Sequence, residues 1–164
     1  MFNYAPDSVN VLVAGFIPLQ GFSDSTFIEI SKDVLPFTAV RTADGTVSRI
    51  YNRDATYTIR ITLNSGSGSN DVLTKLWQLD EITQKGKFPL LIKDLSGTDL
   101  FFSTTTWVEE TPAMVKSVSV DDRTWVLRST QAVINIGGNE EASGLVDDLV
   151  NIAASALPIL EGIL

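Results

Sequence analysis

The sequence predicts a mainly β protein with two helices, and three kinds of pattern support this fold class. Residues 55–63 (ATYTIRITL) alternate apolar and polar side chains with a period of two, which is typical of a strand with one buried face. Gly-containing turn sequences separate further runs of this kind. Residues 70–85 and 140–157 instead repeat apolar side chains at the spacing of an amphipathic helix.

The expected strands are distributed over the first 136 residues. They are residues 9–13, 26–30, 37–42, 46–51, 55–63, 88–93, 99–103, 105–110, 115–120 and 124–136. We expect hairpin tips at Asp44-Gly45 and Ser96-Gly97, because glycine adopts the positive φ that tight turns need. Since the last run is longer than most strands, we also expect a bend or bulge within it.

The first helix is expected over residues 70–85. Ser69, Asn70 and Asp71 can cap its start, Lys85 complements the helix dipole at its end, and Gly86 suits a left-handed C-cap. Its apolar residues form a face that is wider than packing against a single sheet requires. They are Val72, Leu73, Leu76, Trp77 and Leu79. We therefore expect part of this face to contact a neighbouring subunit.

The second helix follows the Gly137-Gly138 break and divides the chain into a β domain, residues 1–138, and a C-terminal segment, residues 139–164. Pro158 ends the helix, and the segment carries five acidic residues and no basic one. Chain ends are normally polar, so an apolar one is expected to pack on another surface. The candidate docking residues are Leu145, Leu149, Ile152, Leu157, Ile159 and Leu160.

Composition excludes several functions. The chain has no cysteine and no histidine, which removes disulfides, thiolate and imidazole catalysis and the usual zinc ligands. A net charge of −8 disfavours a protein that grips nucleic acid. No apolar run is long enough to cross a membrane, and the N-terminus does not read as a signal peptide. The mean hydropathy of +0.16 indicates that apolar surface is buried between subunits or in a large core.

The remaining chemical motifs are weak, and we expect no catalytic residue, metal or cofactor. Residues 64–70 (NSGSGSN) lack the Lys and Ser or Thr that complete a phosphate loop. The carboxylate pairs at 109–110 and 121–122 would suit a two-acid hydrolase only if their members converged, and neighbours on a strand point to opposite faces. Trp77, Trp107 and Trp125 leave a β-sandwich glycan-binding module open as an alternative.

One stretch is basic in this acidic chain. It contains Arg41, Arg49, Arg53 and Arg60 against Asp44 and Asp54. A hairpin with charged edges that discourage strand pairing would explain it. Alternatively, it is an arm that reaches an acidic surface on the next copy, with charge setting the register. Arg41, Asp44, Arg49, Arg53 and Arg60 are therefore the candidate residues for contacts between subunits or rings.

Three segments carry a resemblance to a known family. They are residues 70–102 (NDVLTKLWQLDEITQKGKFPLLIKDLSGTDLFF), 106–113 (TWVEETPA) and 123–139 (RTWVLRSTQAVINIGGN). The sequence resembles the tail-tube proteins of contractile-tailed (myovirus) phages over about residues 9–139. These segments are signatures of a fold, and they contain no catalytic motif.

The resemblance implies a β-barrel or sandwich of the tail-tube type, with one helix packed on the barrel and the C-terminal helix as an addition. It implies homohexameric rings that stack into a tube in the virion, assembled in the host cytoplasm, through which DNA is ejected without specific binding. Tail sheath, baseplate and tail-terminator proteins would be its partners. A type VI-like or non-contractile tube subunit is the nearest alternative.

Overall fold

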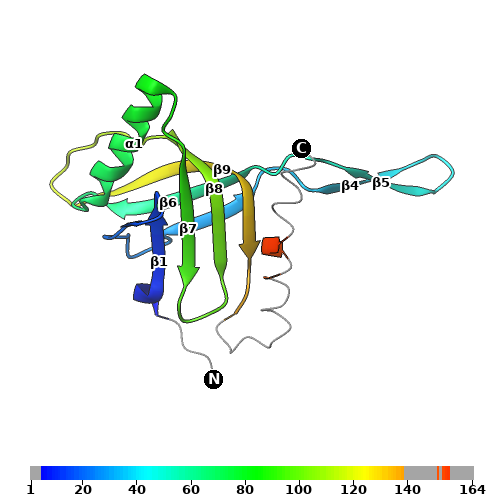
Figure 1. Cartoon of the computed structure of the whole chain (residues 1–164), viewed down its shortest axis with the longest axis horizontal. Coiled ribbons are helices and arrows are strands. Elements are labelled where there is room, and N and C mark those ends of the chain that lie inside the picture. The colour runs from blue at the N-terminus through cyan, green and yellow to red at the C-terminus, as the bar shows by residue number, and fades with distance from the viewer. Residues whose placement is uncertain (1–4, 139–150, 152, 156–164) are drawn as a thin grey trace.

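The computed structural model describes residues 5–138, 151 and 153–155 (Figure 1). After a short 3-10 helix, Pro6–Ser8, the elements follow the order β1 (Val9–Val13), β2 (Ile17–Pro18), β3 (Ile28–Lys32), β4 (Phe37–Arg41), β5 (Val47–Tyr51), β6 (Tyr57–Asn64), α1 (Ser69–Thr83), β7 (Phe88–Asp94), β8 (Leu100–Glu110) and β9 (Asp122–Asn135). The mainly β fold class with a helix on the sheet is therefore confirmed.

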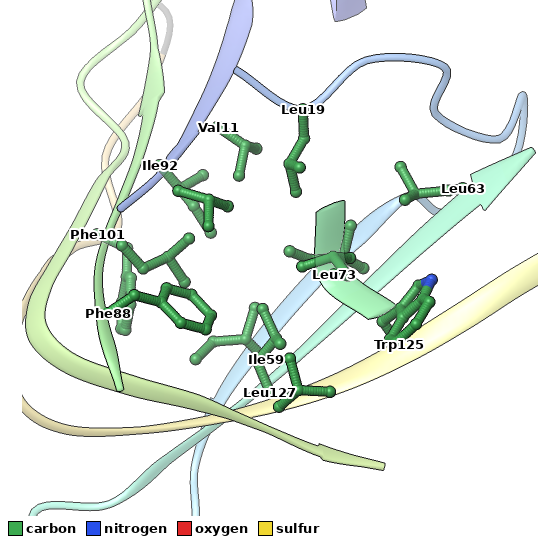
Figure 2. Close-up of a cluster of buried hydrophobic side chains, with 14 of the residues drawn as sticks. Val11, Leu19, Ile59, Leu63, Leu73, Phe88, Ile92, Phe101, Trp125 and Leu127 are labelled. Carbon is green, nitrogen blue, oxygen red and sulfur yellow. The ribbon is translucent and has the colours of Figure 1, made fainter. Parts of the chain in front are cut away.

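Seven of the strands form one antiparallel sheet in the order β2-β1-β7-β8-β9-β6-β3. β4 and β5 pair only with each other and form a separate hairpin. The sheet curls so that β1 and β7 face β6 and β9 across the core (Figure 2). Within the described residues no pairing joins β2 or β1 to β3, so the curled sheet is open along one side.

The core fills the concave side of this sheet. Alternation along β6 buries Ile59, Ile61 and Leu63, as the period-two pattern predicts. The other buried apolar residues are Val11, Val13, Leu19, Tyr57, Leu73, Phe88, Leu90, Ile92, Phe101, Val108, Trp125 and Leu127. Strands from both ends of the sheet thus contribute to a single core.

Helix α1 closes one end of the core through Leu73, which is fully buried (Figure 2). The end of the helix differs from the prediction. The left-handed C-cap is Gln84, with φ 59°, and Lys85 lies beyond the last turn. Gly86 is needed for a different reason: a Cβ there would lie 2.3 Å from the Cβ of Asp80. None of the described helices is long and apolar enough to span a membrane.

Several strand predictions need correction. Residues 115–120 are not a strand: Val115, Val118 and Val120 are exposed in the loop before β9, because no neighbouring strand is available to pair with them. The runs 99–103 and 105–110 form one strand, β8, and the two-residue strand β2 was not predicted. The irregularity expected in the last run lies at Gln131, whose φ is +51°.

Candidate assembly surfaces

The β4–β5 hairpin, which we call the arm, extends from the sheet between β3 and β6 (Figure 1). Every residue from 35 to 55 is exposed. At the tip, Gly45 has φ +85°, and the Asp44 carboxylate accepts hydrogen bonds from the Thr42 hydroxyl and from the Thr46 N–H. The hydrogen bond from Thr42, followed by those from Thr46, lowers the pKa of Asp44 from 3.8 to about 2. The predicted turn is therefore closed by its own side chains.

The two faces of the arm differ in chemistry. One carries Arg49, whose guanidinium lies 3.9 Å from the centre of the Phe37 ring, and Arg41, which pairs with Val47 across the strands. On the other face, Thr38 pairs with Ile50 and Val40 pairs with Ser48, so this face is uncharged. Both faces of the arm thus carry apolar side chains, and Arg41 and Arg49 lie on the same face as Val47 and Tyr51.

Of the five predicted arm residues, the structure places three in or beside the arm strands and one at the tip. Arg41 and Arg49 lie on β4 and β5, Arg53 follows β5, and Asp44 is at the tip. Arg60 is not part of the arm: it lies on β6, with its guanidinium 4.0 Å from the Glu29 carboxylate on β3. Its side chain therefore belongs to the sheet rather than to the arm.

The base of the arm is held by an ion cluster that the sequence did not indicate. Arg128 on β9 binds the carboxylates of Asp33, at the end of β3, and Glu109, on β8. The hydrogen bond to Glu109 is the main cause that raises the pKa of the Arg128 guanidinium. The Thr58 hydroxyl donates a further hydrogen bond to Asp33. The cluster joins β6, β8 and β9 to the end of β3 where the chain leaves for the arm, so it helps to set the direction of the arm.

The predicted helix face is only partly available to a neighbour. Leu73 is buried in the core, and Val72, Leu76 and Trp77 are half-buried. Leu79 is exposed, as is Ile82 one turn further along. Much of the width of the apolar face therefore serves the core, and its open part is the last turns of α1.

The candidate C-terminal docking residues lie outside the described residues. In this segment the structure describes only Asn151 and residues 153–155, which are helical and exposed. The division of the chain at residue 138 and the role of the segment remain predictions.

A groove lies at the open end of the curled sheet, away from α1. It has a volume of about 550 Å³. Its apolar lining comes from β3, β1, β7, β8 and β9, through Ile28, Ile30, Val9, Ile92, Phe101 and Ile134. At its margin are the carboxylates of Asp94 and Asp99 and the exposed side chain of Ile136. The groove exists because β1 and β3 are not paired, which leaves the interior of the sheet accessible.

Three of the four carboxylates that suggested a hydrolase have structural partners. Glu109 binds Arg128, Asp121 accepts a hydrogen bond from Ser117 at 2.7 Å, and Asp122 accepts one from Ser23 at 2.6 Å. In the part of the chain that the structure describes, no three acidic residues gather in a way that could hold a metal ion.

The tryptophans do not form a single exposed platform. Trp125 is buried and donates a hydrogen bond to Asn70, and Trp77 and Trp107 are half-buried on α1 and β8. A glycan-binding module uses exposed aromatic rings, so the geometry offers this alternative no support.

Solved structures with this fold come from contractile injection systems. A chain of the anti-feeding prophage cap (AFP tube terminating cap) has a TM-score of 0.54 and 12% identity, over 82% of this chain and 92% of that chain. A chain of the PVC sheath/tube terminator in the extended state gives 0.53 and 14%, over 83% and 99%. A chain of the PVC sheath-tube complex in the extended state gives 0.53 and 13%, over 81% and 91%. The fold of this chain is thus of the class found in these components of contractile tubes and their terminators.

A sequence relative then gives the family. No protein-family model matches the sequence. Structural protein ORF10 of Pseudomonas phage KPP10 is 33% identical over 152 residues, which cover 88% of this chain and 88% of that protein. The chain therefore belongs to this family of phage structural proteins and is a component of the virion. The resemblance to a phage structural family is confirmed.

Proposed function

We propose that this chain is a ring-forming subunit on the axis of a contractile phage tail, within the tube or at its end. Its family and fold support this role. The observation that carries it is the arm. A two-stranded hairpin is marginally stable alone in water, and this one exposes Val47, Ile50 and Tyr51 to more than half of their full extent. Burial against another subunit would stabilise it.

Closure of a ring would also give hydrogen-bonding partners to the unpaired edges of the sheet. The outer edges of β2 and β3 carry backbone groups available for pairing, and closed assemblies remove such edges. We propose homohexameric rings whose sheets surround a lumen for DNA. The excess of acidic residues, at a net charge of −8, would keep the phosphates from binding. Sheath, baseplate and terminator proteins are the proposed partners, and the role is mechanical rather than enzymatic.

Two positions on the tail axis fit this proposal. A tube subunit stacks on both faces of its ring and therefore polymerises without a fixed length. A terminator ring stacks on one face only and stops growth. Two of the structures with the same fold are described as a tube terminating cap and a sheath/tube terminator, which gives the second position a specific basis.

Electron microscopy of the purified full-length chain over a concentration series tests the proposal. Hollow tubes of variable length would assign the chain to the tube, and isolated rings that never stack would assign it to the terminator. Sedimentation of the same samples would give the number of copies per ring. A monomer at every concentration, by both methods, would contradict the proposed function.

A further inference from the structure

The groove at the open end of the sheet has the chemistry of a docking site. Its floor is apolar and is built from strands near both ends of the sheet, including Val9 of β1 and Ile30 of β3. Its volume of about 550 Å³ falls within the range of pockets that hold a ligand or several side chains. Its margin carries the carboxylates of Asp94 and Asp99. An occupant should therefore be apolar on the contacting side and basic at its flanks.

Asp94 is already engaged within the turn after β7. Its carboxylate accepts hydrogen bonds from Ser8 at 3.0 Å and from Ser96 at 2.7 Å, although it is buried. Asp99 accepts one from the Gly137 N–H at 2.7 Å, but it remains exposed. Asp99 is thus the carboxylate on this margin that an incoming cation can reach.

The arm meets this description. Val47 and Tyr51 are exposed on the face of the arm that also carries Arg41 and Arg49. From residue 35 to residue 55 the chain holds three arginines against two aspartates, within a protein of net charge −8. The C-terminal segment, in contrast, has five acidic residues and no basic one, so Asp94 and Asp99 would repel it.

We propose that the groove receives the arm of a second copy of this chain, with Val47 and Tyr51 against the apolar floor and Arg41 and Arg49, which lie on the same face, toward Asp99. This inference rests on the proposed function and identifies the partner surface of the arm. The arm of the same copy points away from the sheet (Figure 1), so the contact joins different copies. Because arm and groove are different surfaces, each copy donates one and receives another, which generates rings or stacked tubes.

Disulfide trapping tests this pairing directly, because the native chain has no cysteine. Tyr51→Cys on the arm and Ile136→Cys at the groove are both exposed positions, and so is the control Ile82→Cys on α1. Under mild oxidation, we expect a mixture of the Tyr51→Cys and Ile136→Cys chains to give a linked dimer. The mixture of Tyr51→Cys and Ile82→Cys should not. Disulfides form only where two Cα atoms approach within roughly 4.4–6.8 Å, so linkage reports contact.

A second pair of cysteine substitutions controls for unfavourable disulfide geometry in the first pair. Val47→Cys on the arm and Thr26→Cys on the groove lining should also link between copies. Efficient linkage of Ile136→Cys to Leu160→Cys instead, with no linkage to the arm, would assign the groove to the C-terminal segment and overturn the inference.

A groove variant adds an independent measurement. Ile136→Lys places a cation where the arginines should arrive, and we expect it to raise the concentration needed for assembly on the order of tenfold. Ile136→Leu is the matched control and should assemble as the wild type does. Circular dichroism and urea unfolding would show that both variants fold. If wild-type tubes or rings form, while neither cysteine pair links and Ile136→Lys assembles normally, the groove assignment fails and the proposed function stands.

Discussion

At the scale of single residues, the tie between helix and sheet depends on Asn70. Its side-chain amide donates hydrogen bonds to the carbonyl oxygens of Asn64 and Ser67, each at 3.0 Å, and its oxygen accepts one from the Trp125 indole at 2.8 Å. The residue is buried, so all of these bonds form away from water. Asn70 therefore fixes the loop before α1, the helix start and β9 relative to one another.

We expect Asn70→Ala to lower the free energy of unfolding by about 2–3 kcal/mol, because it leaves buried donors and acceptors without partners. Lys75→Ala, at an exposed position on the same helix, should change it by less than about 0.5 kcal/mol. Urea unfolding of both variants, followed by tryptophan fluorescence, gives the comparison. Equal stability of Asn70→Ala and the wild type would show that water replaces these bonds at no cost.

Gly86 is a second residue whose role is steric. A Cβ at this position would lie 2.3 Å from the Asp80 Cβ and 2.7 Å from the Asp80 backbone nitrogen. We expect Gly86→Ala to lower the free energy of unfolding by about 1–3 kcal/mol, because the end of α1 must shift to make room.

Gly68 provides the matched control for that substitution. Its φ of −64° suits alanine, and an added Cβ would meet nothing within 4 Å. Gly68→Ala should therefore change the free energy of unfolding by less than about 1 kcal/mol in either direction. If both glycine variants unfold at the same urea concentration, the close approach at Asp80 is relieved without cost.

At the scale of elements, the arm is the part of the fold with the least support from its own chain. Its strands pair only with each other, and the cluster of Arg128 with Asp33 and Glu109 holds the base. Its aromatic contact is local, between Phe37 and Tyr51, with ring centres 5.3 Å apart. The arm is thus arranged to be presented outward, and its charge should govern how it meets another copy.

Reversing the charge of the arm should therefore weaken assembly. We expect the Arg49→Glu, Arg53→Glu double variant to need a higher protein concentration to form rings or tubes than the wild type. Added salt should weaken wild-type assembly and should affect this variant less, because ions screen the attraction that the variant has lost. Light scattering and electron microscopy at roughly 0.05 and 0.5 M NaCl would measure both effects.

Lys85→Glu, Lys116→Glu is the control for the arm variant. It changes the net charge by the same amount at exposed positions outside the arm. If the arm variant assembles like the wild type at both salt concentrations, charge does not set the register. If the control is impaired to the same degree, the effect comes from net charge rather than from the arm.

At the scale of the whole molecule, we expect the β domain to fold without the C-terminal segment. Among the residues that the structure describes, the core runs from Val11 to Leu127 and is assembled from the sheet and α1. We expect a chain ending at Gly138 to keep its β-sheet circular dichroism and a cooperative unfolding transition. Loss of the fold on truncation would show that the segment completes the core.

The same truncation tests the role predicted for the apolar C-terminal residues. We expect it to weaken assembly of rings or tubes, measured by electron microscopy alongside the full-length chain. Unchanged assembly would leave only a contact with the sheath or terminator. If assembly of the sheath around the tube is unchanged as well, the docking proposal is wrong.

The sequence by itself determined the local structure wherever pattern and burial coincide. Alternation along β6 and helical spacing along α1 predicted both elements, because each depends on side chains within a few residues of one another. The turn at Gly45 was predictable for the same reason. Residues 115–120 show the limit of this reasoning: their β-branched residues favour a strand, but a strand also needs a neighbour, and none is available there.

Only the tertiary structure decided which surfaces remain open. The spacing of apolar residues on α1 could not distinguish Leu73, which is buried, from Leu79, which is exposed. Arg60 belongs to the sheet rather than to the arm because β6 pairs with β3 and β9. The groove exists because β1 with β2 and β3, which are near one another in sequence, lie at opposite ends of one curled sheet and do not pair with each other. Such surfaces arise from pairings between distant segments, and a sequence pattern within one segment does not record them.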